Sequence, residues 1–304
     1  MTHRSAVPLL ILVAFLFGAA LLGHAMWGHY RAVLHDFEPA PPSALLAHPE
    51  QTGIDRLTAV AFTAHDDNRI AGWYVPAKNR AAVIVTHGTN ADRSSMLDEI
   101  RLLADAGFGV LAFDWPGDGE STGEVRWGAP EREALRGAID WLAARSDVDP
   151  DRLGAFGFSM GGYFVTRIAA EDPRLRAVVI ASGPPSYLAY VRRNHRQHGW
   201  LSRLPAEFAI RRVGMQHEAM PPIDCIAAIA PRPVLLLGGS EDRSIPPDMT
   251  RELFERAGEP KALWMIDGAA HGHYIGAAPD DYPRRIIDFY ATHLADRSAG
   301  AGAR

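Results

Sequence analysis

The chain has 304 residues and a formal net charge of −5 at pH 7, and it is 47% hydrophobic, 22% charged and 9% aromatic. This composition excludes a largely disordered or collagen-like chain, and the length allows one large α/β domain whose core needs no disulfide. The mild acidity gives no argument for nucleic-acid binding, and the single cysteine, Cys225, excludes an intramolecular disulfide.

A long apolar stretch near the N-terminus predicts a membrane segment. No Asp, Glu, Lys or Arg occurs over residues 5–30, and about 20 apolar residues are enough to span a bilayer. Arg4 precedes the stretch and Asp36 follows it, so the positive-inside rule places the rest of the chain on the extracytoplasmic side. We therefore expect a membrane anchor over 1–27 and a proline-containing tether over 28–54.

The alternative for this stretch is a cleavable signal peptide. Gly23 and Ala25 have the spacing of the small residues that precede a cleavage site, which would then follow Ala25. The stretch is longer than the roughly 7–15 apolar residues of a typical signal peptide, and this length favours the uncleaved anchor.

From about residue 55 onward, short apolar runs alternate with amphipathic stretches. The first two runs flank a polar turn at 66–68 and predict an antiparallel pair of strands. The later runs are typical of strands buried on both faces of a parallel sheet. Strands are expected at 57–63, 69–75, 81–86, 109–113, 153–158, 175–181, 233–237 and 262–266, and helices at 93–106, 131–144, 159–170, 248–257 and 282–294. The pattern predicts the α/β class, with a mostly parallel eight-stranded sheet and helices on both faces.

One segment interrupts this alternation and is expected to form a small helical cap. The cap is expected at about 184–232, inside a catalytic domain that covers 55–296 and precedes a tail at 297–304. Within the cap, residues 186–217 contain six arginines against a single acidic residue, Glu207. Such a segment is typical either of a solvated helix face or of contact with anionic lipid headgroups or an acidic substrate group.

The strongest chemical signal is the sequence Gly157-Phe158-Ser159-Met160-Gly161. It follows an expected strand and opens an expected helix, which is the context that the motif G-x-S-x-G requires. A turn this tight needs small neighbours and lifts the serine hydroxyl above the sheet. We therefore predict Ser159 as a nucleophile, with the N–H of Met160 directed at the oxyanion.

A serine nucleophile needs a base that an acid holds in place, and in this architecture the acid and then the base follow the serine along the chain. Asp242 follows the strand at 233–237, and His271 follows the strand at 262–266, so both are expected at the carboxyl edge of the sheet. Glu241 is the alternative acid. His273 is the alternative base, but the small residues on both sides of His271 favour His271.

The loop after the third expected strand, His87-Gly88-Thr89-Asn90, is the expected source of a second oxyanion donor. We predict the backbone N–H of Thr89 for this role. His87 is the alternative base of the site, although a histidine in this place is more often structural.

These elements together resemble the α/β-hydrolase superfamily over roughly residues 55–295. The resemblance is carried by His87-Gly88, by the sequence from Asp114 to Ser121, by Gly157–Gly161, by the Asp242 turn and by Ala270-His271-Gly272. Within the superfamily the chain looks most similar to prolyl-oligopeptidase-like, dienelactone-hydrolase-like and acylglycerol-lipase-like serine hydrolases. In the sequence Asp114–Ser121, Pro116 replaces the arginine that is common there, which implies a change in the pocket wall.

The resemblance implies a serine hydrolase that cleaves a carboxylic ester or thioester, including a lipid ester, through an acyl-enzyme and without a cofactor. A peptidase or amidase of the prolyl-oligopeptidase-like type uses the same triad and is the main alternative. Acyl transfer and a non-catalytic binding protein on the same fold are the other two. No His-x-x-x-His pair occurs on an expected helix, so we predict no metal site, and Cys225 is expected to be a buried apolar residue.

Overall fold

The computed structural model describes residues 7–196, 198–215 and 219–296. The first six residues of the expected anchor and all of the expected tail at 297–304 lie outside this range. The described residues divide into two compact units. One unit comprises 7–36 and 188–215, and the other comprises 37–187 and 219–296.

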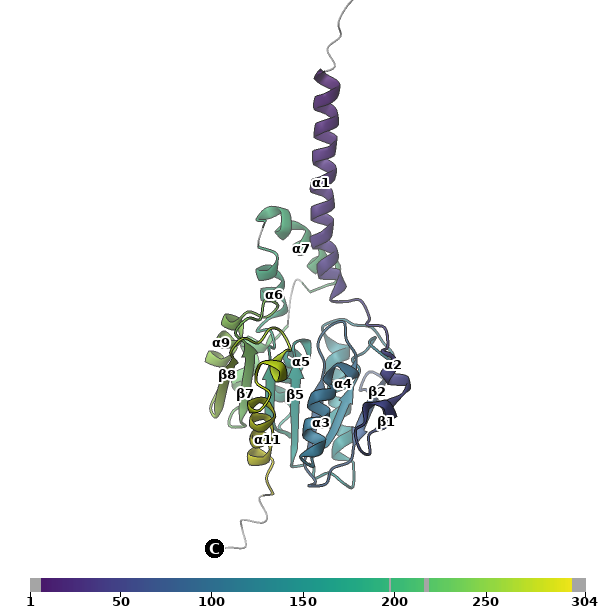
Figure 1. Cartoon of the computed structure of the whole chain (residues 1–304), viewed down its shortest axis with the longest axis vertical. Helices are drawn as coiled ribbons and strands as arrows, with labels where there is room; N and C mark the ends of the chain where they lie inside the picture. The colour runs from purple at the N-terminus through teal and green to yellow at the C-terminus, as the bar shows by residue number, and fades with distance from the viewer. Residues whose placement is uncertain (1–6, 197, 216–218, 297–304) are drawn as a thin grey trace, which may run out of the picture. The chain divides into compact units, whose positions relative to one another are not determined.

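The second unit is built around the predicted eight-stranded sheet (Figure 1), with the strand order β1-β2-β4-β3-β5-β6-β7-β8. β2 pairs antiparallel with both β1 and β4, and all other pairs are parallel. The strands are β1 (Thr58–Thr63), β2 (Arg69–Val75), β3 (Ala82–Thr86), β4 (Gly109–Phe113), β5 (Leu153–Phe158), β6 (Leu175–Ala181), β7 (Val234–Gly239) and β8 (Lys261–Ile266). The predicted fold class is confirmed, and the carboxyl ends of β3 to β8 meet at one edge of the sheet.

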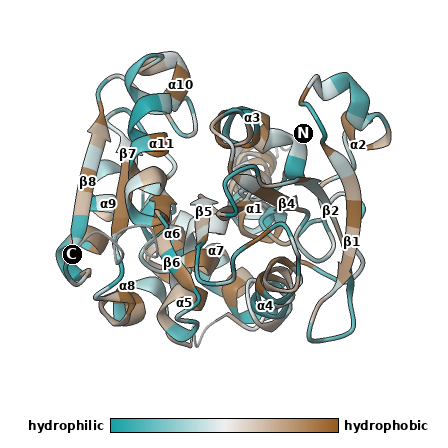
Figure 2. Cartoon of the chain, turned by 90° about the horizontal axis from the view of Figure 1, so that it is seen from below, coloured by the Kyte–Doolittle hydropathy of each residue, from teal (hydrophilic) through white to brown (hydrophobic). Residues whose placement is uncertain are grey.

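Helices cover both faces of the sheet, as the alternating pattern predicted. Figure 2 shows α3 (Leu97–Asp105) and α11 (Asp281–His293) on one face, and α4 (Ala129–Ala143) and α5 (Met160–Glu171) on the other. α9 (Pro247–Arg256) packs on β7 and β8. Ile100 and Leu103 of α3 and Ile286 of α11 are at most 1% exposed and pack on the sheet. Burial of such large apolar side chains, worth about 1.5–3 kcal/mol each, holds these helices in place.

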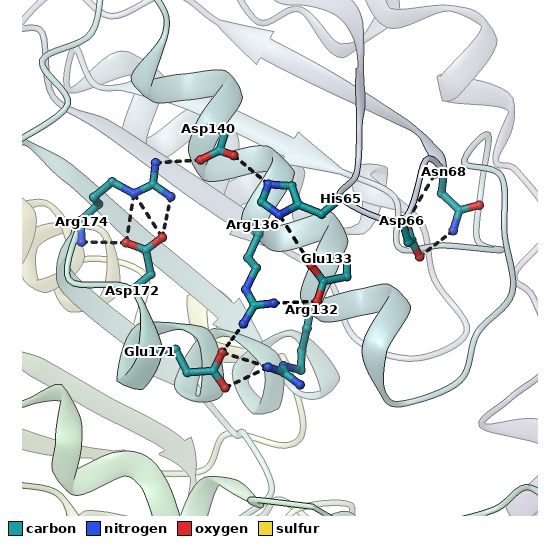
Figure 3. Close-up of polar contacts among 10 residues, drawn as sticks. All are labelled: His65, Asp66, Asn68, Arg132, Glu133, Arg136, Asp140, Glu171, Asp172 and Arg174. Atoms are coloured by element: carbon teal, nitrogen blue, oxygen red, sulfur yellow. Dashed lines mark hydrogen bonds and ion pairs between the residues drawn. The ribbon is translucent and has the colours of Figure 1, made fainter.

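A network of ion pairs ties together elements at the outer face of α4 (Figure 3). Arg136 of α4 pairs with Glu171 at the end of α5 at 2.6 Å. Asp140 of α4 pairs with His65 beside the first hairpin and with Arg174 before β6 at 2.7 Å each. These groups are partly exposed, so each pair contributes little by itself. We interpret this cluster as a structural tie between the hairpin, α4 and β6.

The segment expected as a tether is partly helical and partly docked. α1 runs from Val7 to His35, and α2 (Ala44–Ala47) and η1 (Pro49–Thr52) follow it. Between them, the N–H of Ala40 donates to Asp118 Oδ1 at 2.8 Å, and the N–H of Ser43 donates to Asp92 Oδ2 at 2.7 Å. Carboxylates in the loops after β3 and β4 therefore bind this segment to the sheet unit, which an extended tether would not require.

Between β6 and β7 the chain forms four short helices where the sequence interrupts its alternation. They are α6 (Tyr187–Asn194), α7 (Trp200–Arg212), α8 (Pro222–Cys225) and η3 (Ile226–Ile229). In the first unit, α7 packs along α1, and Ala209 and Ile210 of α7 and Val33 of α1 are buried.

Candidate active site

Ser159 lies at the turn between β5 and α5. Its backbone has φ 54° and ψ −117°, a conformation that non-glycine residues rarely adopt and that often marks functional turns. Its N–H donates to the carbonyl of Ala181 at 2.8 Å, which ties the turn to the end of β6. Because α5 begins at the next residue, Met160, the serine stands at the carboxyl edge of the sheet in front of a helix N-terminus.

Close packing explains the two glycines that flank the serine in the motif. A Cβ on Gly157 would lie 2.5 Å from the carbonyl oxygen of Gly161, and a Cβ on Gly161 would lie 2.5 Å from Thr86 Oγ1. Real side chains do not approach so closely, so any side chain at either position would force the backbone apart. The contact between β3, β5 and the start of α5 therefore requires glycine at both positions.

Asp242 follows β7 and is completely buried, whereas its alternative, Glu241, is exposed. Asp242 Oδ1 accepts the backbone N–H groups of Ser244 at 2.9 Å and Ile245 at 2.8 Å. Burial alone would raise the pKa of Asp242, but the hydrogen bonds from His271, Ile245 and Ser182 outweigh it and lower the pKa. The carboxylate is therefore ionised at neutral pH.

His271 follows β8 and joins the acid to the serine. Its Nδ1 lies 2.7 Å from Asp242 Oδ2, and its Nε2 lies 3.1 Å from Ser159 Oγ. Gly272 has φ +78°, and a Cβ there would lie 2.9 Å from the Phe158 ring, so only glycine lets the loop turn so close to the site. The arrangement of hydroxyl, imidazole and carboxylate is the geometry needed to activate a serine.

His273 does not share this position. It is exposed and precedes α10 (Tyr274–Ala277), and its backbone N–H donates to the carbonyl of Ala270 at 3.2 Å. The structure thus brings His271, and not His273, to Ser159 and Asp242.

The loop after β3 lies against the serine. A Cβ on Gly88 would be 3.1 Å from the Cβ of Ser159, so the next residue, Thr89, stands beside the nucleophile together with the N-terminus of α5. His87 is buried, its Nδ1 lies 2.7 Å from the carbonyl of Gly88, and its Nε2 accepts the N–H of Trp115 at 3.2 Å. Burial lowers the pKa of His87 to about 4. A neutral imidazole with both nitrogens bound to backbone holds the loop and is not available as a base.

Two hydroxyl groups that the sequence reasoning did not identify lie behind the acid. Ser182 Oγ donates to Asp242 Oδ2 at 2.8 Å, and Tyr274 OH donates to Ser182 Oγ at 2.6 Å. Both residues are buried, and Ser182 has φ 45°. Ser182 follows the carboxyl end of β6, between the strands that supply Ser159 and Asp242, and this position was the available signal. We call Tyr274, Ser182 and Asp242 the hydroxyl chain.

A cavity of about 540 Å³ opens beside these residues. Phe158, Ala270 and Gly272, the neighbours of Ser159 and His271, form one wall, and Ser95 and Glu99 form part of the other. Tyr282 OH donates to Glu99 Oε1 at 2.8 Å, and burial raises the pKa of Glu99 to about 7. The cavity therefore offers both apolar and polar contacts to a group bound next to the serine.

Other reactive groups lie apart from this site. Cys225 is buried, and burial raises the pKa of its thiol to about 11, so it is a poor nucleophile at neutral pH. In the part of the chain that the structure describes, no three His, Cys, Asp or Glu side chains are grouped as metal ligands would be.

Comparison with known proteins identifies relatives of this chain. The family described as X-Pro dipeptidyl-peptidase (S15 family) matches residues 47–206. The chain is 30% identical over 274 residues to the uncharacterized protein Rv2307c of Mycobacterium tuberculosis, covering 88% of each chain. It is 30% identical over 249 residues to the uncharacterized protein YfhR of Escherichia coli, covering 78% of this chain and 81% of YfhR. In structure it is similar to the Pyrococcus furiosus esterase Pf2001, with a TM-score of 0.71, 22% identity and coverage of 85% and 99%.

Proposed function

Because this chain belongs to the X-Pro dipeptidyl-peptidase (S15) family and is a hydrolase of the α/β-hydrolase superfamily, we propose that it cleaves carboxylic esters or thioesters through a Ser159–His271–Asp242 triad. The observation that carries this proposal is the continuous contact from Asp242 Oδ2 through His271 to Ser159 Oγ, at 2.7 Å and 3.1 Å.

In the proposed reaction, Ser159 Oγ attacks the substrate carbonyl while His271 Nε2 takes the hydroxyl proton. Asp242 holds the imidazole and stabilises its charged form. The N–H groups of Met160 and Thr89 bind the oxyanion, His271 then protonates the leaving group, and an acyl group remains on Ser159. Water activated by His271 attacks this acyl-enzyme, which releases the acid and restores the serine.

The contacts of Asp242 support its role as the orienting acid. It lies between four donors, so it needs no proton and cannot rotate away from His271. The proposed mechanism needs no cofactor, because every proton transfer takes place between groups of the chain, the substrate and water.

A second candidate activity is cleavage of an amide or peptide bond, and the S15 family match favours it. The match covers Ser159 but ends before Asp242 and His271. The same triad can attack an ester or an amide, so the choice depends on how the cavity beside Phe158 holds the substrate.

The experiment that separates these activities is a series of p-nitrophenyl esters of increasing acyl length, measured beside glycyl-prolyl-p-nitroanilide. The ester proposal predicts that kcat/KM for the best ester exceeds that for the anilide by more than the difference in leaving-group reactivity. A preference for the anilide would overturn it and establish the peptidase.

We also propose that α1 anchors the protein in a membrane, with the hydrolase domain on the extracytoplasmic side. α1 holds one long apolar span, Leu9–His35, whose most apolar window is not buried at all. The helix continues through Ala25, and Tyr30 contacts Phe208 of α7, which favours retention of this segment over cleavage. Labelling of whole cells with a membrane-impermeant thiol reagent, on an exposed engineered cysteine in the sheet unit, tests the assigned side.

A further inference from the structure

Exposed apolar side chains are concentrated on α7. Outside α1, the exposed large hydrophobic side chains of the described residues are Trp200, Leu204, Phe208 and Met220. The first three are 60%, 56% and 63% exposed, and their spacing of four residues places them along one face of α7. We call these three residues the α7 stripe.

A helix on a globular protein normally turns its apolar face inward and its charged face outward. α7 buries the small residues Ser202, Ala206 and Ala209 and turns the stripe outward. A contiguous apolar face of this kind, left exposed, indicates a contact with a membrane or a partner.

The position of α7 along α1 indicates which of these two it is. A bilayer core of about 30 Å takes about 20 residues of α1 counted from Leu9, so Trp27 and Tyr30 lie at its boundary. The Tyr30 ring lies 5.8 Å from the Phe208 ring. Met26 and Trp27 also line an apolar hollow of about 500 Å³ together with Leu204 and Phe208. The α7 stripe is therefore at the depth of α1 where headgroups meet acyl chains.

The charge around the stripe also fits a membrane surface. The acidic residue of the segment, Glu207, is paired with Arg192 at 2.7 Å. Arg203, Arg211 and Arg212 on the exposed side of α7 add positive charge beside the stripe. Arginine binds phosphate through several N–H donors, and clustered arginines at a membrane surface favour anionic lipids.

We propose that the α7 stripe inserts into the boundary between headgroups and acyl chains of the bilayer that α1 spans, with Arg203, Arg211 and Arg212 bound to anionic lipid phosphates. The proposal rests on the anchor proposed above. It adds a second membrane contact, made by the chain between β6 and β7, which would hold α7 at the lipid surface.

The test uses the full chain in lipid nanodiscs with Cys225→Ala as the background, because Cys225 is its single cysteine. An environment-sensitive fluorophore is placed on Leu204→Cys, on Leu16→Cys within the span, or on Asp151→Cys. Asp151 has 80% of its side chain exposed and lies in the loop before β5, and its label gives the reference for collisional quenching. The nanodiscs contain lipids with a spin label high or low on the acyl chain.

The proposal predicts that the label at residue 204 loses about half of its fluorescence to the shallow spin label and less to the deep one, as expected for a group 5–10 Å below the surface. The label at residue 16 should respond more strongly to the deep spin label. A label at residue 204 that resembles the Asp151 reference, while residue 16 is quenched, would overturn the α7 contact and leave the anchor intact. An unquenched label at residue 16 would instead refute the anchor, and with it this inference.

The arginines are tested in the same assay by changing the lipid charge. Exchanging neutral phosphatidylcholine for phosphatidylglycerol should increase the quenching at residue 204, and Arg203→Gln with Arg212→Gln should remove most of that increase. A response to lipid charge that is equal with and without the two arginines would overturn their assignment to lipid phosphates.

Discussion

Replacing Tyr274 by phenylalanine removes the outer hydroxyl of the hydroxyl chain and little else. The ring is 2% exposed and packs against Phe158 and Tyr282, so phenylalanine fills the same space. The lost hydrogen bond is the one from Tyr274 OH to Ser182 Oγ at 2.6 Å. Ser182 keeps its own donor to Asp242, but its hydroxyl then becomes free to rotate away from the carboxylate.

The size of the effect follows from burial. Leaving a buried polar group without its partner costs about 1–3 kcal/mol, and each kcal/mol lowers Tm by about 2–4 °C in a domain of this size. We expect Asp242 to hold His271 less firmly, so kcat should fall by about tenfold with little change in KM, because the substrate itself is not touched.

The assay is kcat and KM on one activated ester for Tyr274→Phe, Ser182→Ala and the double variant. If the tyrosine acts through Ser182, its substitution should cost little further activity once Ser182 is alanine. Tyr290→Phe is the matched control, because Tyr290 is also fully buried and donates to the carbonyl of Ala155 at 2.7 Å, away from the acid. This control should lose stability but keep its kcat. Independent, additive losses for Tyr274 and Ser182, or an equal loss of kcat in Tyr290→Phe, would refute the reasoning.

Three further predictions concern the site and its surroundings. His271→Ala should lower kcat/KM on an activated ester by several orders of magnitude, whereas His273→Ala should lower it by about tenfold or less; the reverse order would exchange the two assignments. Glu99→Gln should raise Tm relative to wild type at pH 8 but not at pH 4, since the folded-state pKa of Glu99 is raised from 4.5 to about 7, so wild-type stability falls, by on the order of 2 kcal/mol, as the pH rises through this interval; parallel Tm curves from pH 4 to 8 would contradict this. Gly161→Ala should give little folded protein, because its Cβ would lie 2.5 Å from Thr86 Oγ1; normal expression and labelling of this variant would contradict the packing argument.

The sequence predicted the sheet well because its strands are short, apolar and separated by amphipathic helices. The eight expected strands differ from the observed ones by at most one residue at either end. The helix expected at 93–106 begins instead with a 3₁₀ turn, η2 (Arg93–Met96), because the Asp92 side chain accepts the N–H of Ser94 and closes a tighter turn. Such a local hydrogen bond is not visible in hydrophobic periodicity.

The positions of Ser159, Asp242 and His271 could be predicted because each follows the carboxyl end of a strand, and parallel strands bring these ends together. The hydroxyl chain could not be predicted in the same way. Tyr274 reaches Ser182 from the loop after β8, across a sequence separation of 92 residues, and no spacing rule connects them. The docking of Ala40 and Ser43 on buried carboxylates was missed because proline-containing segments are usually extended and solvated.

The central claim, that Ser159 is the nucleophile of a serine hydrolase, is tested most directly by covalent labelling with a fluorophosphonate probe. We predict that the wild-type chain is labelled and that Ser159→Ala is not, while its far-UV circular dichroism and Tm remain close to those of wild type. A folded Ser159→Ala variant that still takes up the probe would contradict the account, because another residue would then be the nucleophile.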